Sequence, residues 1–386
     1  MRIVVVGAGI AGLTLAAALS GGQSRVVLLE QHQDPTPVGS GLQLAPNAAR
    51  PLLRMGLGGE LGEVAVRPRS RDFLRWDDGR LLHGTAMGVE YERRYGAPLY
   101  TLLRSDLHRI LLRAARDASV LRGRYVTDVL EESDGVTLVC SDGREVHGDI
   151  AIGADGVHSV MRGVLNTEQH PPSGQLVYRG LVPATSVPEG FADPRIRIWM
   201  GADRHFAAYP VSGGATISFN ASVPGGEGRR ESWSERGRLS DLTRAFEGWA
   251  EDVGTLAGAA SWIGVWGIEV REAVRAWHHG RIALMGDAAH PTLPFFAQGA
   301  NQAVEDAVVL ADCLRGATAL TAERALARYA RLRRERTERI HAVAREVVHE
   351  MALDEEGPGR RDELLGGTGG PSSDWLYGYD VAAHLG

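Results

Sequence analysis

The segment Gly7-Ala8-Gly9-Ile10-Ala11-Gly12 has residue types and a spacing that could bind a pyrophosphate. It lies between a β-branched run at 3–6 and an alanine- and leucine-rich stretch that ends near Leu19, a pattern that predicts strand, turn and helix. In such a turn the first glycine permits the tight bend, the second lets the backbone approach a phosphate, and the third lets helix and strand pack closely. Glu30 ends the next apolar run, where a carboxylate can bind ribose hydroxyls. We therefore expect a site for FAD or NAD, because an acid at this place disfavours the 2′-phosphate of NADP.

Two further motifs each follow a short apolar run directly. Residues 155–162 read Asp-Gly-Val-His-Ser-Val-Met-Arg, and residues 286–291 read Gly-Asp-Ala-Ala-His-Pro. An aspartate at the carboxyl end of a parallel strand points into the ligand crevice, so Asp287 can accept hydrogen bonds from a ribityl chain. The segment 298–301, Gln-Gly-Ala-Asn, starts a helix whose first N–H groups can face an electron-rich ring oxygen. For Asp155 the residues alone leave a ligand contact and an ordinary helix start equally open.

The elements that must position these motifs fall into two patterns. Short apolar runs, typical of buried parallel strands, lie at 3–6, 26–29, 150–152 and 281–285. Alternating runs, typical of an antiparallel sheet, lie at 176–181, 196–200, 206–211 and 216–223. Beyond residue 302 the apolar residues recur at helical spacing.

These patterns predict an α/β protein with an insertion. We expect a Rossmann-like domain with a parallel sheet, formed by residues 1–174 and completed by 276–356 together with the C-terminal helices. A mostly antiparallel β-sheet domain, residues 175–275, would be inserted into it. Residues 357–386 would form a tail.

The composition excludes several classes of function. The 386 residues are 44% hydrophobic and 23% charged, which excludes a disordered chain, and the net charge of −6 offers no basic footprint for nucleic acid. All 42 basic residues are arginine, which excludes a lysine Schiff base and a P-loop. The two cysteines, Cys140 and Cys313, lack metal-ligand spacing, so we expect no metal and a reducing, cytoplasmic setting. No apolar run is long enough to span a bilayer, and we expect no contact with a membrane.

The three motifs, in this order and spacing, resemble those of the single-component FAD-dependent aromatic hydroxylases, the class A flavoprotein monooxygenases. The segment 155–162 matches the family's Asp-Gly motif, and 286–291 matches its Gly-Asp motif. The ending 375–380, Trp-Leu-Tyr-Gly-Tyr-Asp, is similar to that of salicylate hydroxylase, 6-hydroxynicotinate 3-monooxygenase and 3-hydroxybenzoate 6-hydroxylase. The resemblance implies that the Rossmann-like domain binds FAD and that the inserted sheet binds the substrate.

The resemblance also implies a set of cofactor contacts. Arg104 matches the arginine that reaches the flavin, Val126 lies where the family contacts adenine through its backbone, and Gln43 belongs to the loop near the isoalloxazine. The residues expected to bind FAD without a covalent bond are Gly7, Gly9, Ala11, Gly12, Glu30, Gln31, Gln43, Arg104, Val126, Asp155, Asp287, Gly299, Ala300 and Asn301. No second Gly-x-Gly-x-x-Gly marks a nicotinamide domain, which agrees with NADH or NADPH binding transiently as the reductant.

For the substrate, the resemblance points to a His-x-x-x-Tyr pair, which this chain keeps as His205 and Tyr209. Both lie on one face of a strand, and Ala207 between them leaves room for a ring. A histidine of near-neutral pKa can take a phenolic proton, although from the residues alone a packed core histidine stays open. Asn47 stands where the 6-hydroxynicotinate enzyme carries histidine, which weakens that assignment. Pro294 follows the commoner family pattern, and we expect both residues to contact substrate.

The implied reaction is an NAD(P)H- and O2-dependent hydroxylation of a small phenolic or heteroaromatic acid through a flavin hydroperoxide, with His205 and Tyr209 as the catalytic pair. A tailoring monooxygenase that hydroxylates or epoxidises natural products is a second interpretation. A flavin oxidase or dehydrogenase, reduced by its own substrate, is a third, and an FAD-binding regulator without catalysis is a fourth. The sequence leaves open the choice of NADH or NADPH, the position hydroxylated, and a monomer or a homodimer.

Overall fold

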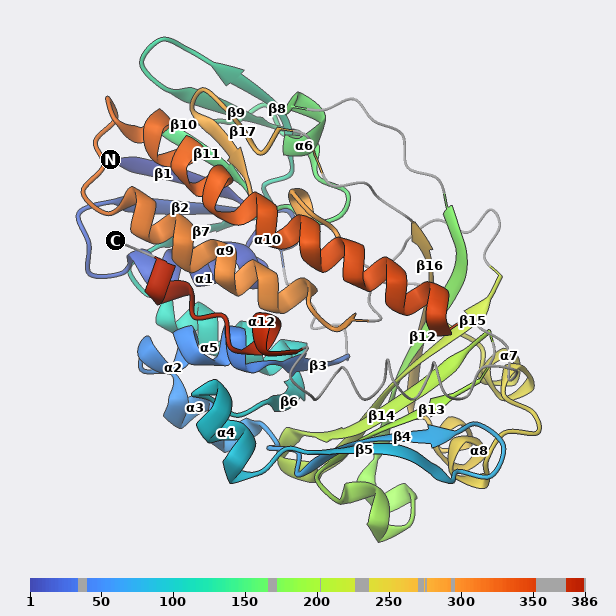
Figure 1. The fold of residues 1–386 in the computed structure, drawn as a ribbon. Helices are drawn as coiled ribbons and strands as arrows, with labels where there is room; N and C mark the ends of the chain where they lie inside the picture. Colours follow the sequence, from blue (N-terminus) through green and yellow to red (C-terminus); the bar gives the residue numbers. More distant parts are fainter. Residues whose placement is uncertain are drawn as a thin grey trace.

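The structure is a computed structural model that describes residues 1–33, 40–165, 172–201, 203–225, 236–269, 274, 276–292, 296–351 and 373–384. Two large sheets organise it, a six-stranded sheet and a seven-stranded sheet (Figure 1). Two small sheets accompany them: β3 (Gly41–Leu44) pairs with β6 (Tyr100–Leu103), and β8 (Val126–Glu131), β9 (Val136–Cys140) and β10 (Glu145–Gly148) form a meander.

The six-stranded sheet confirms the predicted parallel layer. Its order is β17 (His278–His279), β18 (Ile282–Leu284), β11 (Ile150–Gly153), β1 (Arg2–Val6), β2 (Arg25–Glu30) and β7 (Ser119–Arg122). Every neighbouring pair is parallel except β17 with β18. Its central strands are apolar and fully buried, which explains why they read as continuous hydrophobic runs.

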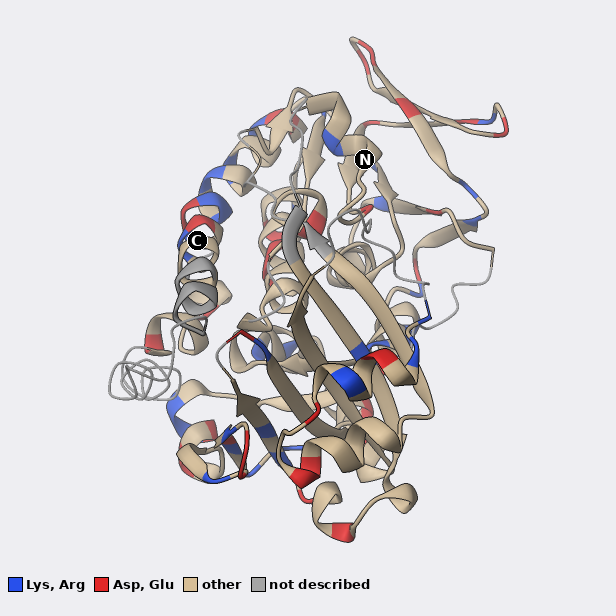
Figure 2. Cartoon of the chain, turned by 90° about the vertical axis from the view of Figure 1, so that its right-hand side faces the viewer, with Lys and Arg blue, Asp and Glu red and all other residues tan. Residues whose placement is uncertain are grey.

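Four helices hold this sheet and its ligand crevice in place. They are α1 (Ile10–Leu19), α5 (Arg104–Ala114), α9 (Gly299–Leu314) and α10 (Ala322–Met351). Helix α9 packs between α1 and α10, so the segment after residue 299 is anchored on both sides (Figure 1). Both arginine and acidic residues lie along α10 (Figure 2).

The seven-stranded sheet confirms the predicted antiparallel layer. Its order is β16 (Trp262–Glu269), β12 (Pro172–Pro183), β15 (Thr216–Pro224), β14 (His205–Val211), β13 (Arg195–Met200), β4 (Ser70–Arg75) and β5 (Leu81–Ala86). One face packs on α7 (Leu239–Ala245) and α8 (Glu251–Gly258) through a core that contains Trp199, Phe206 and Phe219.

Strands β4 and β5 join this sheet from the segment 1–174, which we expected to belong wholly to the FAD-binding domain. Strand β4 pairs in parallel with β13, a partner more than a hundred residues away in the chain. Such a pairing leaves no local pattern in the sequence, so the expected boundary missed it. The remaining boundaries of the division into 1–174, 175–275, 276–356 and 357–386 stay predictions.

The shorter elements complete the fold. They are α2 (Pro46–Arg54), α3 (Gly58–Val64), α4 (Val89–Tyr95), α6 (Val160–Leu165), α12 (Asp374–Tyr377) and the 3-10 turns at Ala184–Ser186, Glu189–Ala192, Ser212–Gly214, Gly286–Ala288 and Val381–His384. Within the part of the chain that the structure describes, no helix is long and apolar enough to cross a membrane.

Candidate active site

The glycine turn after β1 has the shape of a phosphate cradle. Gly7 has a φ of +101°, in the left-handed region that favours glycine, and a Cβ there would overlap the carbonyl oxygen of Ala154. A Cβ at Gly12 would overlap the carbonyl oxygen of Gly7. In contrast, a Cβ at Gly9 would meet nothing within 4 Å, so open space lies directly before the N-terminus of α1. The residues therefore fit a pyrophosphate, whose charge the free helix N–H groups favour.

Glu30 closes this cradle at the end of β2. One carboxylate oxygen accepts a hydrogen bond from Ala8 N–H at 3.1 Å, and the other accepts from His32 N–H at 2.9 Å. A carboxylate offers about four acceptor positions, so capacity for ribose hydroxyls remains. Gln31 beside it is exposed, and Val126 is buried at the start of β8. The predicted contacts of these residues with the adenosine half of FAD stay predictions.

Asp155 and Arg162 connect the second motif to the third. The Asp155 carboxylate accepts from the Ser159 hydroxyl at 2.6 Å and from Met161 N–H at 3.1 Å, so it caps the start of α6. Burial raises the pKa of Asp155, and these donors oppose the rise. Arg162 donates from Nε to Ala288 O at 2.7 Å and from a second nitrogen to Asp287 O. The carboxylate of Asp155 thus binds groups of this chain at the start of α6. Arg162, which the sequence did not single out, binds the backbone of the loop that carries Asp287.

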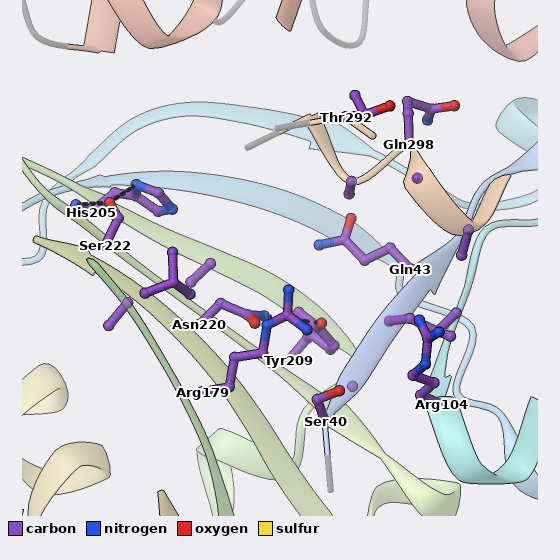
Figure 3. Close-up of a pocket in the computed structure, with 18 of the residues that line it drawn as sticks. Ser40, Gln43, Arg104, Arg179, His205, Tyr209, Asn220, Ser222, Thr292 and Gln298 are labelled. Atoms are coloured by element: carbon purple, nitrogen blue, oxygen red, sulfur yellow. Dashed lines mark hydrogen bonds between the residues drawn. The ribbon is translucent and has the colours of Figure 1, made fainter. Parts of the chain in front are cut away.

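A cavity of about 200 Å³ lies where the two large sheets meet (Figure 3). One wall comes from residues 40–43, at the start of β3, and Arg104, and a second from Asp287, Thr292 and residues 297–300. The third wall is one face of the seven-stranded sheet, called here the sheet face, made of Val177, Arg179, Ile198, His205, Ala207, Tyr209, Asn220 and Ser222. The structure thus brings Gln43, Arg104, Asp287, Gly299 and Ala300 together with His205 and Tyr209.

The two walls opposite the sheet face carry the predicted flavin contacts. Desolvation lowers the pKa of the Arg104 guanidinium, while the charge of Asp287 raises it. The first helical hydrogen bond of α9 runs from Gln302 N–H to Gln298 O, so the N–H groups of residues 299–301 precede it and have no acceptor within the helix. The Asn301 side chain accepts from Ala45 N–H at 2.8 Å and donates to Gln43 O at 3.0 Å. Asn301 therefore ties β3 to the start of α9.

On the sheet face, alternation along β14 separates core from cavity. Phe206 and Ala208 point into the core under the sheet, while His205, Ala207 and Tyr209 line the cavity. His205 Nδ1 shares a hydrogen bond of 2.6 Å with the Ser222 hydroxyl (Figure 3). Burial lowers the pKa of His205 to about 4, in place of the near-neutral value that we expected. The imidazole is therefore neutral at physiological pH.

Tyr209 lies four residues beyond His205, on the same face of β14. Its hydroxyl accepts from Asn220 Nδ2 at 3.2 Å. Burial raises the pKa of Tyr209, while Asn220 and the charge of Arg179 lower it. Gly41 begins β3 directly against this ring, because a Cβ at Gly41 would lie 2.8 Å from Tyr209 Cε2 and 2.7 Å from Ser218 Oγ. The loop expected near the isoalloxazine therefore touches the sheet face.

Comparison with known proteins identifies the family. A family model described as an FAD-binding domain matches residues 1–346. A 3-amino-4-hydroxybenzoate 2-monooxygenase of Streptomyces platensis is 40% identical over 99% of this chain and 96% of its own length. The chain belongs to the class A FAD-dependent aromatic hydroxylases. The 6-hydroxynicotinate 3-monooxygenase of Pseudomonas fluorescens is 31% identical over 98% of this chain and 95% of its own length. A salicylate hydroxylase in complex with its substrate superposes with a TM-score of 0.83 at 25% identity, covering 100% of this chain and 97% of that one.

This hydroxylase is thus an FAD-dependent aromatic monooxygenase, and NAD(P)H is the reductant typical of its family. For two of the residues expected to contact substrate, the structure gives no such contact to report. Pro294 falls outside the described residues. Asn47 is buried behind the wall, where its amide nitrogen donates to Gln298 Oε1 at 3.2 Å and to Glu305 Oε1 at 2.7 Å. Its position therefore supports a role in holding Gln298, which lines the cavity, and gives no support to a contact with substrate.

Asn47 belongs to a buried set of polar side chains around α9, called here the α9 network. Arg333 donates to Asp306 at 2.7 Å, to Glu305 at 2.7 Å and to Gln302 at 2.6 Å. Arg336 donates to both oxygens of Glu305 and to the backbone carbonyls of Trp375 and Leu376. The members are Asn47, Gln298, Gln302, Glu305, Asp306, Arg333 and Arg336. The network connects the tail motif at 375–380 to the start of α9, and no signal in the sequence predicted it.

Proposed function

We propose that this hydroxylase converts a small hydroxylated aromatic carboxylic acid, with 3-amino-4-hydroxybenzoate as the first compound to test. The names of three relatives support it, because aminohydroxybenzoate, hydroxynicotinate and salicylate each combine a ring hydroxyl with a carboxylate. The observation that carries the proposal is the cavity itself. His205 and Tyr209 line one wall, and Arg104, Asp287 and residues 299–300 line the other two.

The cofactor would occupy the crevice between the glycine turn and this cavity. Bound FAD supplies electron transfer from NADH or NADPH and the activation of O2. Gly7, Gly9, Ala11 and Gly12 would hold the pyrophosphate, and Glu30 the ribose. Arg104 and the N–H groups of residues 299–301 would face the ring system, where positive charge and helix donors favour negative charge on the reduced cofactor.

His205 would accept or share the phenolic proton of the substrate. Ser222 holds Nδ1 of the ring, which fixes the imidazole at the lining of the cavity. A pKa of about 4 makes the imidazole a weak base in the protein alone, and an anionic substrate beside it raises that pKa. A positioned general base contributes about 100- to 10,000-fold to a rate.

Anaerobic reduction and product analysis test the function. The purified protein is mixed with NADH or NADPH, with and without 3-amino-4-hydroxybenzoate, 6-hydroxynicotinate or salicylate, and products are identified by mass. We expect one acid to accelerate flavin reduction and to gain an oxygen atom in air. Bleaching of the flavin by an aromatic compound without pyridine nucleotide would instead make the protein an oxidase or dehydrogenase.

Replacing His205 tests the assigned proton transfer. His205→Ala should lower the hydroxylation rate at saturating substrate by about 100-fold or more while the FAD content stays unchanged. His279→Ala is the matched control, because His279 is exposed on β17. A hydroxylation rate in His205→Ala equal to that of the parent protein, at every pH, would refute the role.

The cellular setting and the assembly also belong to the proposal. Cys140 and Cys313 are both buried with free thiols, which supports a reducing, cytoplasmic setting. The protein would act as a monomer or a homodimer, and light scattering of the FAD-loaded protein distinguishes the two.

A further inference from the structure

One cation of the sheet face has no part in the proton transfer described so far. Arg179 lies on β12, in register with Asn220 of β15, which in turn is in register with Ala207 of β14. All three side chains line the cavity, so Arg179 shares a face with His205 and Tyr209. In Figure 3 the guanidinium lies beside Asn220 and Tyr209.

Packing holds the guanidinium in a defined orientation. Its central carbon lies 4.5 Å from the centroid of the Trp266 ring, a cation–π contact that fixes the place of the group beside the cavity. The N–H donors of a guanidinium form a planar fork that matches the two oxygens of a carboxylate. A guanidinium held here suits a planar anion as ligand.

The charge of the cavity favours such an anion. Among the described residues that line it, two are arginines, Arg104 and Arg179, and one is an aspartate, Asp287. Asp287 interacts electrostatically with Arg104. The excess of arginine over carboxylate in the lining favours an anionic ligand.

The strand order sets the distance that a ligand must span. Strand β15 separates β12 from β14, so the two backbones are about 10 Å apart at a spacing of about 4.8 Å per strand. Arg179 and His205 both project into the cavity from these strands, and the small Ala207 lies between them along β14. Side chains of this length reach opposite ends of one aromatic ring.

We propose that Arg179 binds the carboxylate of the substrate while the ring lies over Ala207 and a ring hydroxyl faces His205. This inference rests on the proposed function and adds the orientation of the substrate and the residue that reads its acid group. It follows that the enzyme selects aromatic acids over the uncharged amides of the same ring, and that the selection resides in Arg179.

Two variants and one pair of substrates test this. The kcat/KM for 3-amino-4-hydroxybenzoate and for 3-amino-4-hydroxybenzamide is measured in the FAD-loaded wild-type protein, in Arg179→Met and in Arg179→Lys. We expect the wild-type enzyme to prefer the acid, and Arg179→Met to lose about 10- to 100-fold on the acid and little on the amide. Arg179→Lys keeps the charge without the fork, so its preference should be intermediate.

Arg197→Met is the matched control, because Arg197 lies on β13 of the same sheet but is not part of the cavity lining. Its guanidinium lies 5.8 Å from the centroid of the Phe191 ring and donates to Gly190 O. It should keep the preference for the acid. FAD content and the far-UV spectrum verify folding in each variant, and if Arg179→Met does not fold, Arg179→Lys carries the test.

The outcomes separate the two proposals. If the wild-type enzyme hydroxylates the acid but Arg179→Met retains its full preference for acid over amide, the role of Arg179 is refuted and the proposed function stands. If the wild-type enzyme hydroxylates only uncharged aromatics, the proposed function fails together with this inference.

Discussion

The α9 network is buried and the sheet face lines a cavity, and their ionisable side chains differ in the charge that they carry. In the network, burial raises the pKa of Asp306, but His290 and Arg333 lower it, and the resulting pKa is about 2. On the sheet face, burial lowers the pKa of His205 to about 4 and raises that of Tyr209. Burial favours the neutral form in both places, and at Asp306 the nearby opposite charges outweigh it.

The difference separates a structural cluster from a functional one. The carboxylates of the network are matched by guanidiniums at 2.6–2.7 Å, so the network is ionic in the folded protein by itself. His205 and Tyr209 of the sheet face are neutral, so their protonation can respond to the charge of a ligand. Three predictions follow from this contrast, ordered from the largest expected effect to the smallest.

Arg333→Met should break the network. It leaves Asp306 and Glu305 buried with fewer counter-charges, and removing one partner of a buried ion pair destabilises a protein by about 3–5 kcal/mol. Chemical denaturation of the FAD-loaded protein measures the loss. Because the pKa of Asp306 is depressed in the folded state, its contribution is present above about pH 4 and is lost as pH falls towards 2.

The control for Arg333→Met is Arg334→Met, on the next residue of the same helix. Arg334 forms an exposed pair with Glu338, so its loss should cost less than about 1 kcal/mol. Equal destabilisation by the two variants would show that the buried network contributes no more than a surface pair.

Arg336→Met should separate the tail from the network. Arg336 is one of two cations at Glu305, and it also donates to two carbonyls of α12, so we expect a smaller loss of about 1–3 kcal/mol. The expected signature is faster hydrogen exchange in residues 373–384 and in the first turn of α9. Arg339→Met, which removes only a ring contact with Trp375, is the control. Unchanged exchange at both places would refute the connection.

The smallest effect concerns the protonation of His205 without substrate. With a pKa near 4, its imidazole should not titrate between pH 5.5 and 8. NMR of protein with 13C-labelled histidine, compared with His205→Asn to assign the resonance, measures this. A titration midpoint near 6.5 would show that burial does not lower the pKa of His205 as described.

Much of the site could be predicted from the sequence where it depends on neighbours in the chain. The glycine turn at 7–12, the strand before it and the alternation along β14 were each confirmed, because φ, spacing and strand period are local properties. The positions of Asn47 and of the segment 70–86 could not be predicted in this way. The partners of Asn47 are Gln298 and Glu305, and the partner of β4 is β13, so each depends on elements far along the chain.

The sequence by itself determined the nucleotide cradle, the buried parallel strands and which residues of β14 share a face. Only the tertiary structure decided that Arg179 lies in line with Asn220 and Ala207, that Arg333 meets Asp306, and that the tail reaches Glu305 through Arg336. The physical reason is that cross-strand register and buried ion pairing depend on strand order and on the path of long connections, which no stretch of neighbouring residues encodes.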